Sequence, residues 1–294
     1  MTRTMLVLTV ALAATGVRVA RATDVTLCGQ KIARGDTGIL RNDLVCGTTA
    51  EGLCAECDTP GCTVRGDIPC TTPADCTSLG GSPVCLGVAV HLGERATLEM
   101  DGFSISSVAP GQMGAGVFCD GHCKIRGPGD VSGAIGWGIR AYEARAFDVT
   151  LHDNYYGLSA QRSRLFNVML TGNVIGAEAY TMTIAGGAAS DNSVGLVAYS
   201  VRGKDFAAND NGDGVDGEVV SLKRATVNGN GNYGVLALRK AALLDSTVTG
   251  SGHFDIGSFY RPRVVNTTCG TSVMILTPGS GGSTGDSWGV CAGD

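Results

Sequence analysis

Apolar and polar residues alternate in short runs through the middle of the chain, and these runs recur at a fixed distance. Asparagine returns five times at a spacing of 19 residues, and glycine follows each of the first four asparagines by three residues. The asparagines are Asn154, Asn173, Asn192, Asn211 and Asn230, and the glycines are Gly157, Gly176, Gly195 and Gly214, with Gly138 one period earlier. Self-similarity at a period of about 20 residues is typical of a solenoid, in which each repeat buries its apolar side only by stacking on its neighbours.

Within each repeat the alternation has a period of two, which predicts strands. The first and third residues after each glycine are apolar or small, as in Ile139 and Ala141, so they should point inward. A second alternating run, such as Val149 to Leu151, precedes each asparagine. The Asn and Gly fall between the runs, where a tight turn needs residues that tolerate left-handed backbone conformations. We expect the asparagine side chains to hydrogen-bond along the stack, and the fold to be an all-β parallel β-helix.

The ends of the chain and one internal segment depart from this pattern. Arg3 precedes an apolar run, and Ala20-Arg21-Ala22 resembles a signal-peptidase site, although an uncleaved membrane anchor is the alternative. Residues 51–86 are dense in Cys, Pro, Gly and Thr and predict a disulfide-bonded insertion. The expected organisation is a secretory signal peptide at 1–22, an N-terminal cap at 23–50, the insertion at 51–86, the parallel β-helix at 87–262 and a C-terminal cap at 263–294.

The chain has 12 cysteines, which in a secreted protein indicate disulfides. Proximity in the sequence predicts three pairs: Cys28 with Cys46, Cys119 with Cys123, and Cys269 with Cys291. The other six would pair among themselves within the insertion, and these are Cys54, Cys57, Cys62, Cys70, Cys76 and Cys85. Cys54, Cys57 and Cys62 could instead bind zinc.

Composition and charge exclude some classes of partner. The formal charge is −5, and removal of the signal segment with its three arginines changes it to −8. An acidic chain without an evident basic stripe is a poor candidate for binding nucleic acid. No segment after the signal approaches 18 consecutive apolar residues, so we expect no membrane association after cleavage.

One stretch carries a resemblance to a known family. The residues Lys124-Ile-Arg-Gly-Pro-Gly-Asp-Val-Ser-Gly133, followed by Gly138-Ile139 and the Asn and Gly series, resemble the right-handed parallel β-helix repeat proteins of the pectate-lyase-like superfamily. The resemblance covers roughly residues 88–262 and Leu27-Cys28-Gly29. It implies a right-handed parallel β-helix with coils of about 19–22 residues. It implies no particular activity, because the superfamily contains lyases, hydrolases, epimerases and adhesins.

The catalytic motifs of that superfamily are not intact here. Asn266-Thr267-Thr268 lacks the aspartate of an Asn-Thr-Asp motif, Gly121-His122-Cys123 lacks the second glycine of Gly-His-Gly, and the sequence has no Asp-Asp pair. No catalytic residue can therefore be carried over, and a glycosidase, which needs two carboxylates at a fixed separation, is disfavoured.

One acidic cluster is a candidate calcium site. Asp210, Asp213, Asp216 and Glu218 lie on a single predicted coil. Alternating oxygen ligands followed by glycine resemble the first half of a calcium loop. The position of the usual bidentate glutamate is Val220, and the alternative is that the repeat itself accounts for part of this pattern.

Two outward columns are candidates for ligand binding. Tyr142, Gln161, Tyr180 and Tyr199, with Arg140 and Glu178 beside them, could form an aromatic and hydrogen-bonding surface for sugars, although tyrosine is common in strands. Arg145, Arg164 and Arg202 each follow a repeat glycine by seven residues. They could bind the carboxylates or sulfates of an acidic glycan, supply the base of a lyase, or simply form a solvated edge.

These features predict a secreted or cell-surface protein, with a periplasmic location as a further option. The favoured hypothesis is a non-catalytic solenoid that presents one face to polysaccharide or to another partner. The alternatives are a calcium-dependent polysaccharide lyase or related carbohydrate-active enzyme, and a purely structural or adhesive solenoid.

Overall fold

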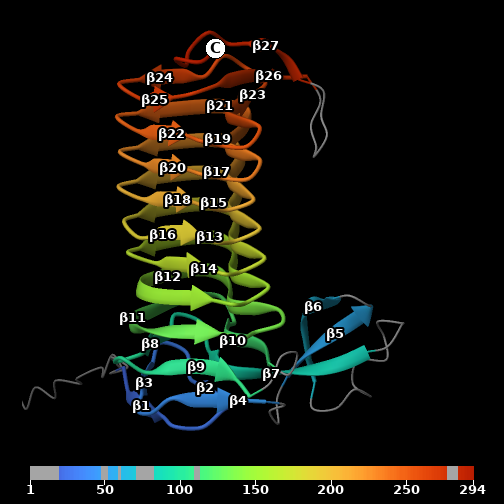
Figure 1. Ribbon diagram of the computed structural model, residues 1–294. Helices are drawn as coiled ribbons and strands as arrows, with labels where there is room; N and C mark the ends of the chain where they lie inside the picture. The colour runs from blue at the N-terminus through green and yellow to red at the C-terminus, as the bar shows by residue number, and fades with distance from the viewer. Residues whose placement is uncertain (1–19, 48–51, 59–60, 71–82, 109–112, 277–283) are drawn as a thin grey trace, which may run out of the picture.

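A computed structural model describes residues 20–47, 52–58, 61–70, 83–108, 113–276 and 284–294, with side chains placed for 20–47, 87–108, 113–276 and 285–294. Over these ranges every regular element is a strand, and the strands stack as a parallel β-solenoid of about 11 turns (Figure 1). In the described ranges no helix has the length and apolarity that a membrane crossing requires.

Each central coil has three faces. A long strand forms two of them, because it bends at a corner in its middle. At this corner two consecutive residues, such as Gln161 and Arg162, both point outward and are exposed. We call the part before the corner face A and the part after it face B. The long strands are β12 (Trp137–His152), β13 (Tyr156–Phe166), β15 (Ile175–Ala185), β17 (Val194–Lys204), β19 (Asp213–Lys223) and β21 (Tyr233–Leu244).

Short strands form the third side, face C, together with the last residues of β12. They are β14 (Met169–Thr171), β16 (Ala188–Ser190), β18 (Ala207–Asn209), β20 (Thr226–Asn228), β22 (Thr247–Thr249) and β25 (Thr268–Cys269). Every neighbouring pair among these strands is parallel.

The lower coils continue the same stack. β1 pairs with β3, β3 with β8 and β8 with β11, all in parallel, and β4 pairs with β9. The strands are β1 (Ala22–Val25), β2 (Gln30–Ile32), β3 (Thr37–Leu40), β4 (Leu44–Cys46), β7 (Pro83–Leu92), β8 (Thr97–Glu99), β9 (Ser104–Ser107), β10 (Met113–Cys119) and β11 (His122–Ser132).

The cysteine-rich segment projects from these lower coils (Figure 1). β5 (Gly52–Asp58) pairs antiparallel with both β6 (Gly61–Cys70) and the first half of β7. The side chains of its six cysteines lie outside the described residues, as does the alternative zinc site.

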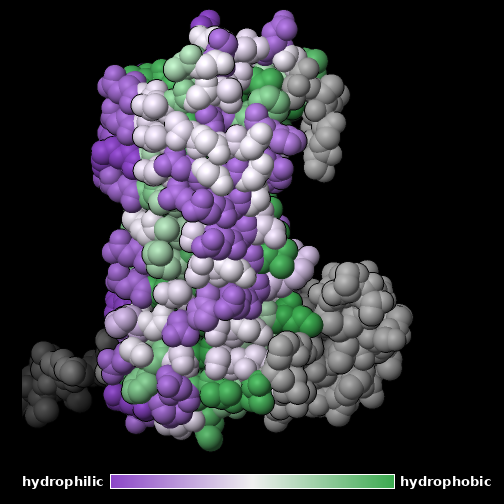
Figure 2. All heavy atoms as spheres, viewed as in Figure 1, coloured by the Kyte–Doolittle hydropathy of each residue, from purple (hydrophilic) through white to green (hydrophobic). Residues whose placement is uncertain are grey.

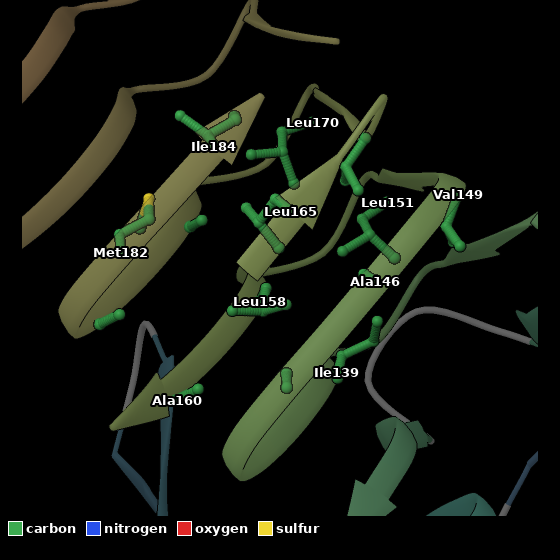
Figure 3. Close-up of a cluster of buried hydrophobic side chains, with 14 of the residues drawn as sticks. Ile139, Ala146, Val149, Leu151, Leu158, Ala160, Leu165, Leu170, Met182 and Ile184 are labelled. Carbon is green, nitrogen blue, oxygen red and sulfur yellow. The ribbon is translucent and has the colours of Figure 1, made fainter. Parts of the chain in front are cut away.

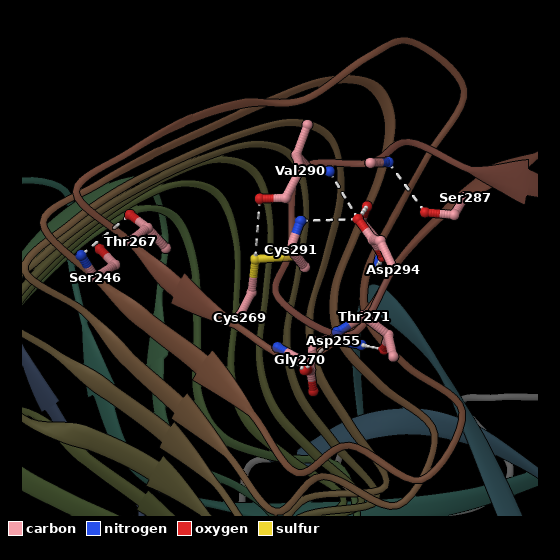
Figure 4. Close-up of a disulfide and its surroundings, with 12 residues drawn as sticks. Ser246, Asp255, Thr267, Cys269, Gly270, Thr271, Ser287, Val290, Cys291 and Asp294 are labelled. Carbon is pink, nitrogen blue, oxygen red and sulfur yellow. Dashed lines mark hydrogen bonds between the residues drawn. A yellow bond between two sulfur atoms is a disulfide. The ribbon is translucent and has the colours of Figure 1, made fainter.

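The upper end closes with a change of strand direction. β23 (Phe254–Ser258), β24 (Arg263–Val265) and β26 (Ser272–Ile275) add in parallel, whereas β27 (Thr284–Ser287) pairs antiparallel with β26. The Asp294 carboxylate accepts hydrogen bonds from the backbone N–H and the hydroxyl group of Ser272. It also accepts hydrogen bonds from the backbone N–H groups of Val290 and Cys291 (Figure 4). Burial raises the pKa of Asp294, but the hydrogen bonds from Ser272 and from the backbone outweigh this effect and lower the pKa to about 2.

The three disulfides predicted outside the insertion are confirmed. They join Cys28 to Cys46, Cys119 to Cys123, and Cys269 to Cys291. The last of these ties β25 to the C-terminal segment, next to the hydrogen bonds of Asp294 (Figure 4). Such bonds are typical of proteins that mature in an oxidising compartment.

A narrow apolar core runs up the inside of the coils. The residues predicted to point inward are buried, and Ile139, Leu158 and Leu196 have no exposed surface. Leu165 and Ile184 on face B and Leu170 on face C are equally buried, so all three faces contribute (Figure 3). On the visible outer side hydrophilic residues predominate and hydrophobic residues form only small separate patches (Figure 2).

The asparagine stack is also confirmed. The Nδ2 of each of Asn154, Asn173, Asn192 and Asn211 donates to the Oδ1 of the next asparagine at 2.9–3.2 Å. The same Oδ1 accepts the backbone N–H of the asparagine below at 2.9–3.1 Å. All five side chains are buried. Each amide therefore satisfies backbone groups that the turn would otherwise leave unpaired.

The reason for the repeated glycines differs from the expected one. The glycines of the series do not have positive φ; the left-handed residue is the one before each asparagine, such as Asp191 (φ 57°) or Gly172 (φ 65°). A Cβ at Gly176 would lie 2.4 Å from the carbonyl oxygen of Gly195. The glycines are thus required by the close approach of successive coils, and not by backbone conformation.

We predict that Asn192→Ala lowers the free energy of unfolding by about 3 kcal/mol, because it removes the acceptor of Asn173 and the donor to the backbone carbonyls of Leu170 and Ser190. Urea denaturation measures the change. Asn232 is exposed, and Asn232→Ala should change stability by less than about 0.5 kcal/mol. Equal effects of the two substitutions would contradict a special role for the stack.

Candidate functional site

The outward side chains of face B form three columns along the stack. The parallel registers stack equivalent outward residues of successive strands. The first column, next to the corner, contains His122, Glu143, Arg162, Thr181, Ser200, Val219 and Lys240, and the second contains Thr97, Lys124, Arg145, Arg164, Thr183, Arg202, Ser221, Ala242 and Arg263. The third column contains Glu99, Arg126, Phe147, Phe166, Ala185, Lys204, Lys223, Leu244 and Val265.

These columns make face B basic. They contain ten lysines and arginines and two carboxylates, Glu99 and Glu143, within a chain whose formal charge is −5. The expectation that the chain has no basic stripe is therefore wrong. The cations are scattered in the sequence, and only the stacking of coils brings them onto one side.

A groove of about 240 Å³ lies in the middle of face B. It spans four strands, and its lining is polar apart from Met182. The lining residues are Glu143, Arg162, Ser163, Arg164, Thr181, Met182, Thr183, Ser200 and Arg202. Arg164 and Arg202 belong to the arginine column predicted from the sequence.

The arginines of the groove are available to a ligand. Arg162, Arg164 and Arg202 are exposed, and no other described side chain forms an ion pair or a hydrogen bond with them. Thr181, Thr183 and Ser200 add hydroxyl groups between them. Ser163 is 2% exposed, and its Oγ has no hydrogen-bond partner among the described residues. Guanidinium and hydroxyl donors together suit carboxylate, sulfate or phosphate oxygens.

Arg145 belongs to the same column but is not available in the same way. Its Nη2 lies 3.1 Å from Glu143 Oε1, and the Nε2 of His122 lies 3.4 Å from Glu143 Oε2. Only 10% of the Glu143 side chain is exposed to solvent. Glu143 therefore neutralises Arg145 at the lower end of the groove.

The predicted tyrosine column lies at the corner between faces A and B. The rings of Tyr180 and Tyr199 are parallel, with centroids 4.8 Å apart. Arg239 donates to the hydroxyl of Tyr199 at 2.9 Å. Each ring covers one face of the other, so the pair offers a sugar its outer faces, its edges and its hydroxyl groups. Tyr142, lower in the column, meets His122 edge-on, and Gln161 is exposed.

Arg140 and Glu178 lie on face A, away from the groove. Arg140 stacks over Trp137 at 4.8 Å and donates to Ser159 at 2.7 Å. Burial, and secondarily Glu178, raise the pKa of Tyr156. The sequence-predicted binding residues thus separate into a face A set, a corner set and the face B arginines.

The four candidate calcium ligands do not converge as a metal centre. Asp210 occupies the left-handed turn between faces C and A, whereas Asp216 points outward from face A. Asp213 and Glu218 are close enough to Asp216 to influence its ionisation. Among the side chains that the structure describes, no three or more His, Cys, Asp or Glu residues form a group that could hold a metal ion.

The sequence interpretation missed Arg162, Glu143 and the hydroxyl groups of the groove. The corner places two consecutive residues outward, which shifts the phase of the alternation by one position. The run Arg162-Ser-Arg164-Leu, with its own period of two, was the available signal.

The chain matches no protein-family model, no characterised protein and no solved structure. The parallel β-solenoid is therefore established by the structure itself, and membership of the pectate-lyase-like superfamily stays a prediction.

We predict that Asp216→Asn stabilises the protein at neutral pH. Burial, then Asp213 and Glu218, raise the pKa of Asp216 from 3.8 to about 6. The native state therefore binds more protons than the unfolded state between these pH values, and stability falls as the pH rises through this window. The variant should melt a few degrees higher than the wild type at pH 7.5 and at nearly the same temperature at pH 3.5. A gain of the same size at both pH values would contradict this assignment.

Proposed function

We propose that this protein is an extracellular, non-catalytic β-solenoid that binds an acidic polysaccharide along face B. The observation that carries the proposal is the groove with three exposed arginines, each without an ionic partner among the described side chains. The disulfides and the signal-like N-terminal sequence support an extracellular location.

The shape of the site supports a polymeric ligand. Face B is continuous over the stacked strands, and its cations extend from Lys124 to Arg263. An elongated basic face attracts a long anionic chain and holds it by many weak contacts, none of which needs to be strong.

The groove supports binding better than cleavage. It contains one carboxylate, Glu143, which is already held by Arg145 and His122. Hydrolysis of a glycosidic bond uses two carboxyl groups at a defined separation.

We predict that Arg164→Ala and Arg202→Ala each weaken binding of acidic polysaccharide roughly tenfold, because each loses charge-assisted hydrogen bonds. Affinity electrophoresis through gels containing hyaluronan, polygalacturonate, alginate or neutral dextran measures the effect. Arg41 lies in a turn at the base of the stack, paired with Asp24, so Arg41→Ala is the charge-matched control and should bind like the wild type.

Retardation by the acidic gels alone, with the polymer length unchanged, supports the proposal. Absence of retardation in every acidic gel, or equal losses in Arg41→Ala and Arg164→Ala, would overturn it. Shortening of the polymer would instead identify an enzyme.

A further inference from the structure

From β11 to β17 the unpaired cations of face B lie on alternate strands, whereas above β17 Lys223, Lys240 and Arg263 follow on the successive strands β19, β21 and β24. Lys124 projects from β11, Arg162 and Arg164 from β13, and Arg202 from β17. Within the described part of the chain none of these four side chains has an ion-pair or hydrogen-bond partner. The remaining cations on these strands are paired, Arg126 with Glu99 at 2.8 Å and Lys204 with Asp205 at 3.7 Å.

The two intervening strands are neutral on this face. On β12 the charge of Arg145 is balanced by Glu143 at 3.1 Å. On β15 the three outward residues are Thr181, Thr183 and Ala185. The sequence of strands from β11 to β17 therefore reads charged, neutral, charged, neutral, charged.

The registers fix the distance between the charged strands. Lys124 pairs with Arg145, Arg145 with Arg164, Arg164 with Thr183, and Thr183 with Arg202. Neighbouring strands lie about 4.8 Å apart, so between β11 and β17 unpaired cations recur roughly every 10 Å. In an extended glycan each sugar advances the chain by about one strand spacing, so the repeat of the cations matches a disaccharide.

Building on the proposed function, we propose that the ligand is a linear glycan with one carboxylate or sulfate on every second sugar. It lies parallel to the stack axis across β11 to β17, with its anionic groups at Lys124, at Arg162 and Arg164, and at Arg202. The uncharged sugars lie against β12 and β15, where Thr181 and Thr183 can hydrogen-bond to hydroxyl groups.

A polymer with a charge on every sugar fits the segment from β11 to β17 less well. Every second carboxylate would lie opposite a strand with no unpaired cation, and one of them would approach the carboxylate of Glu143. Like charges brought together across an interface oppose binding and so discriminate between ligands. The closely spaced phosphates of a nucleic acid strand fit less well again.

The test compares two carboxylated polymers at equal carboxylate concentration. Hyaluronan has one carboxylate per disaccharide, and polygalacturonate has one per sugar. We expect the wild type to bind hyaluronan roughly tenfold more tightly by calorimetry. Single-stranded DNA is the third polymer, and tighter binding of DNA than of hyaluronan would overturn the assignment to a glycan.

A gain-of-charge variant tests the spacing directly. Thr183→Arg places a cation on the neutral strand β15 and should shift the affinity ratio severalfold toward polygalacturonate. Thr226 is an exposed threonine on face C, so Thr226→Arg adds the same charge elsewhere and should leave the ratio unchanged. Equal shifts in the two variants would mean that net charge alone decides affinity, which would overturn the proposal that the spacing of the cations selects the ligand.

Failure of this inference is distinguishable from failure of the proposed function. If both polymers bind equally and Arg164→Ala weakens the binding of both, face B binds acidic polysaccharide but does not discriminate between ligands by the spacing of their charges. If neither polymer binds, the proposed function itself fails.

Discussion

The contact between successive asparagines controls the rest of this structure. The side chains of Asn154, Asn173 and Asn192 each bond at once to the backbone of their own turn, to the coil below and to the coil above, so a coil cannot slip by one residue without losing all of these bonds. The glycine three residues later lets the coils approach to the distance at which those bonds form. Because the register is fixed in this way, outward side chains at equivalent positions must fall into straight columns.

The columns explain how an acidic protein acquires a basic face. Aspartate is common at the left-handed turn positions, as at Asp148, Asp191 and Asp210, because its short side chain tolerates this backbone conformation. Seven aspartates of the described residues have this backbone conformation, so part of the negative charge lies at the turns and outside face B. Ten lysines and arginines of the strands lie on face B, so the overall charge says little about the field that a ligand would meet there.

The fold could be predicted from the sequence because every repeat has the same pattern of apolar, asparagine and glycine positions. Asn154 and its four successors, the inward Ile139 and Leu158, and three disulfide pairs could all be predicted from spacing alone. The arginine column at Arg145, Arg164 and Arg202 followed from the same spacing. The groove could not be predicted as a unit, because the corner at Gln161 and Arg162 interrupts the period of two. The pairing of Arg145 with Glu143, which separates a neutralised arginine from the unpaired ones, depends on side-chain geometry that no spacing reveals.

The central claim is that a ligand contacts face B and leaves the other arginines of the stack untouched. Modification of the mature protein with phenylglyoxal, read out by mass spectrometry with and without saturating hyaluronan, tests it residue by residue. The account predicts protection of Arg162, Arg164 and Arg202 and unchanged reaction of Arg34 and Arg41 at the base. Protection spread evenly over all these arginines, or confined to the base, would contradict it.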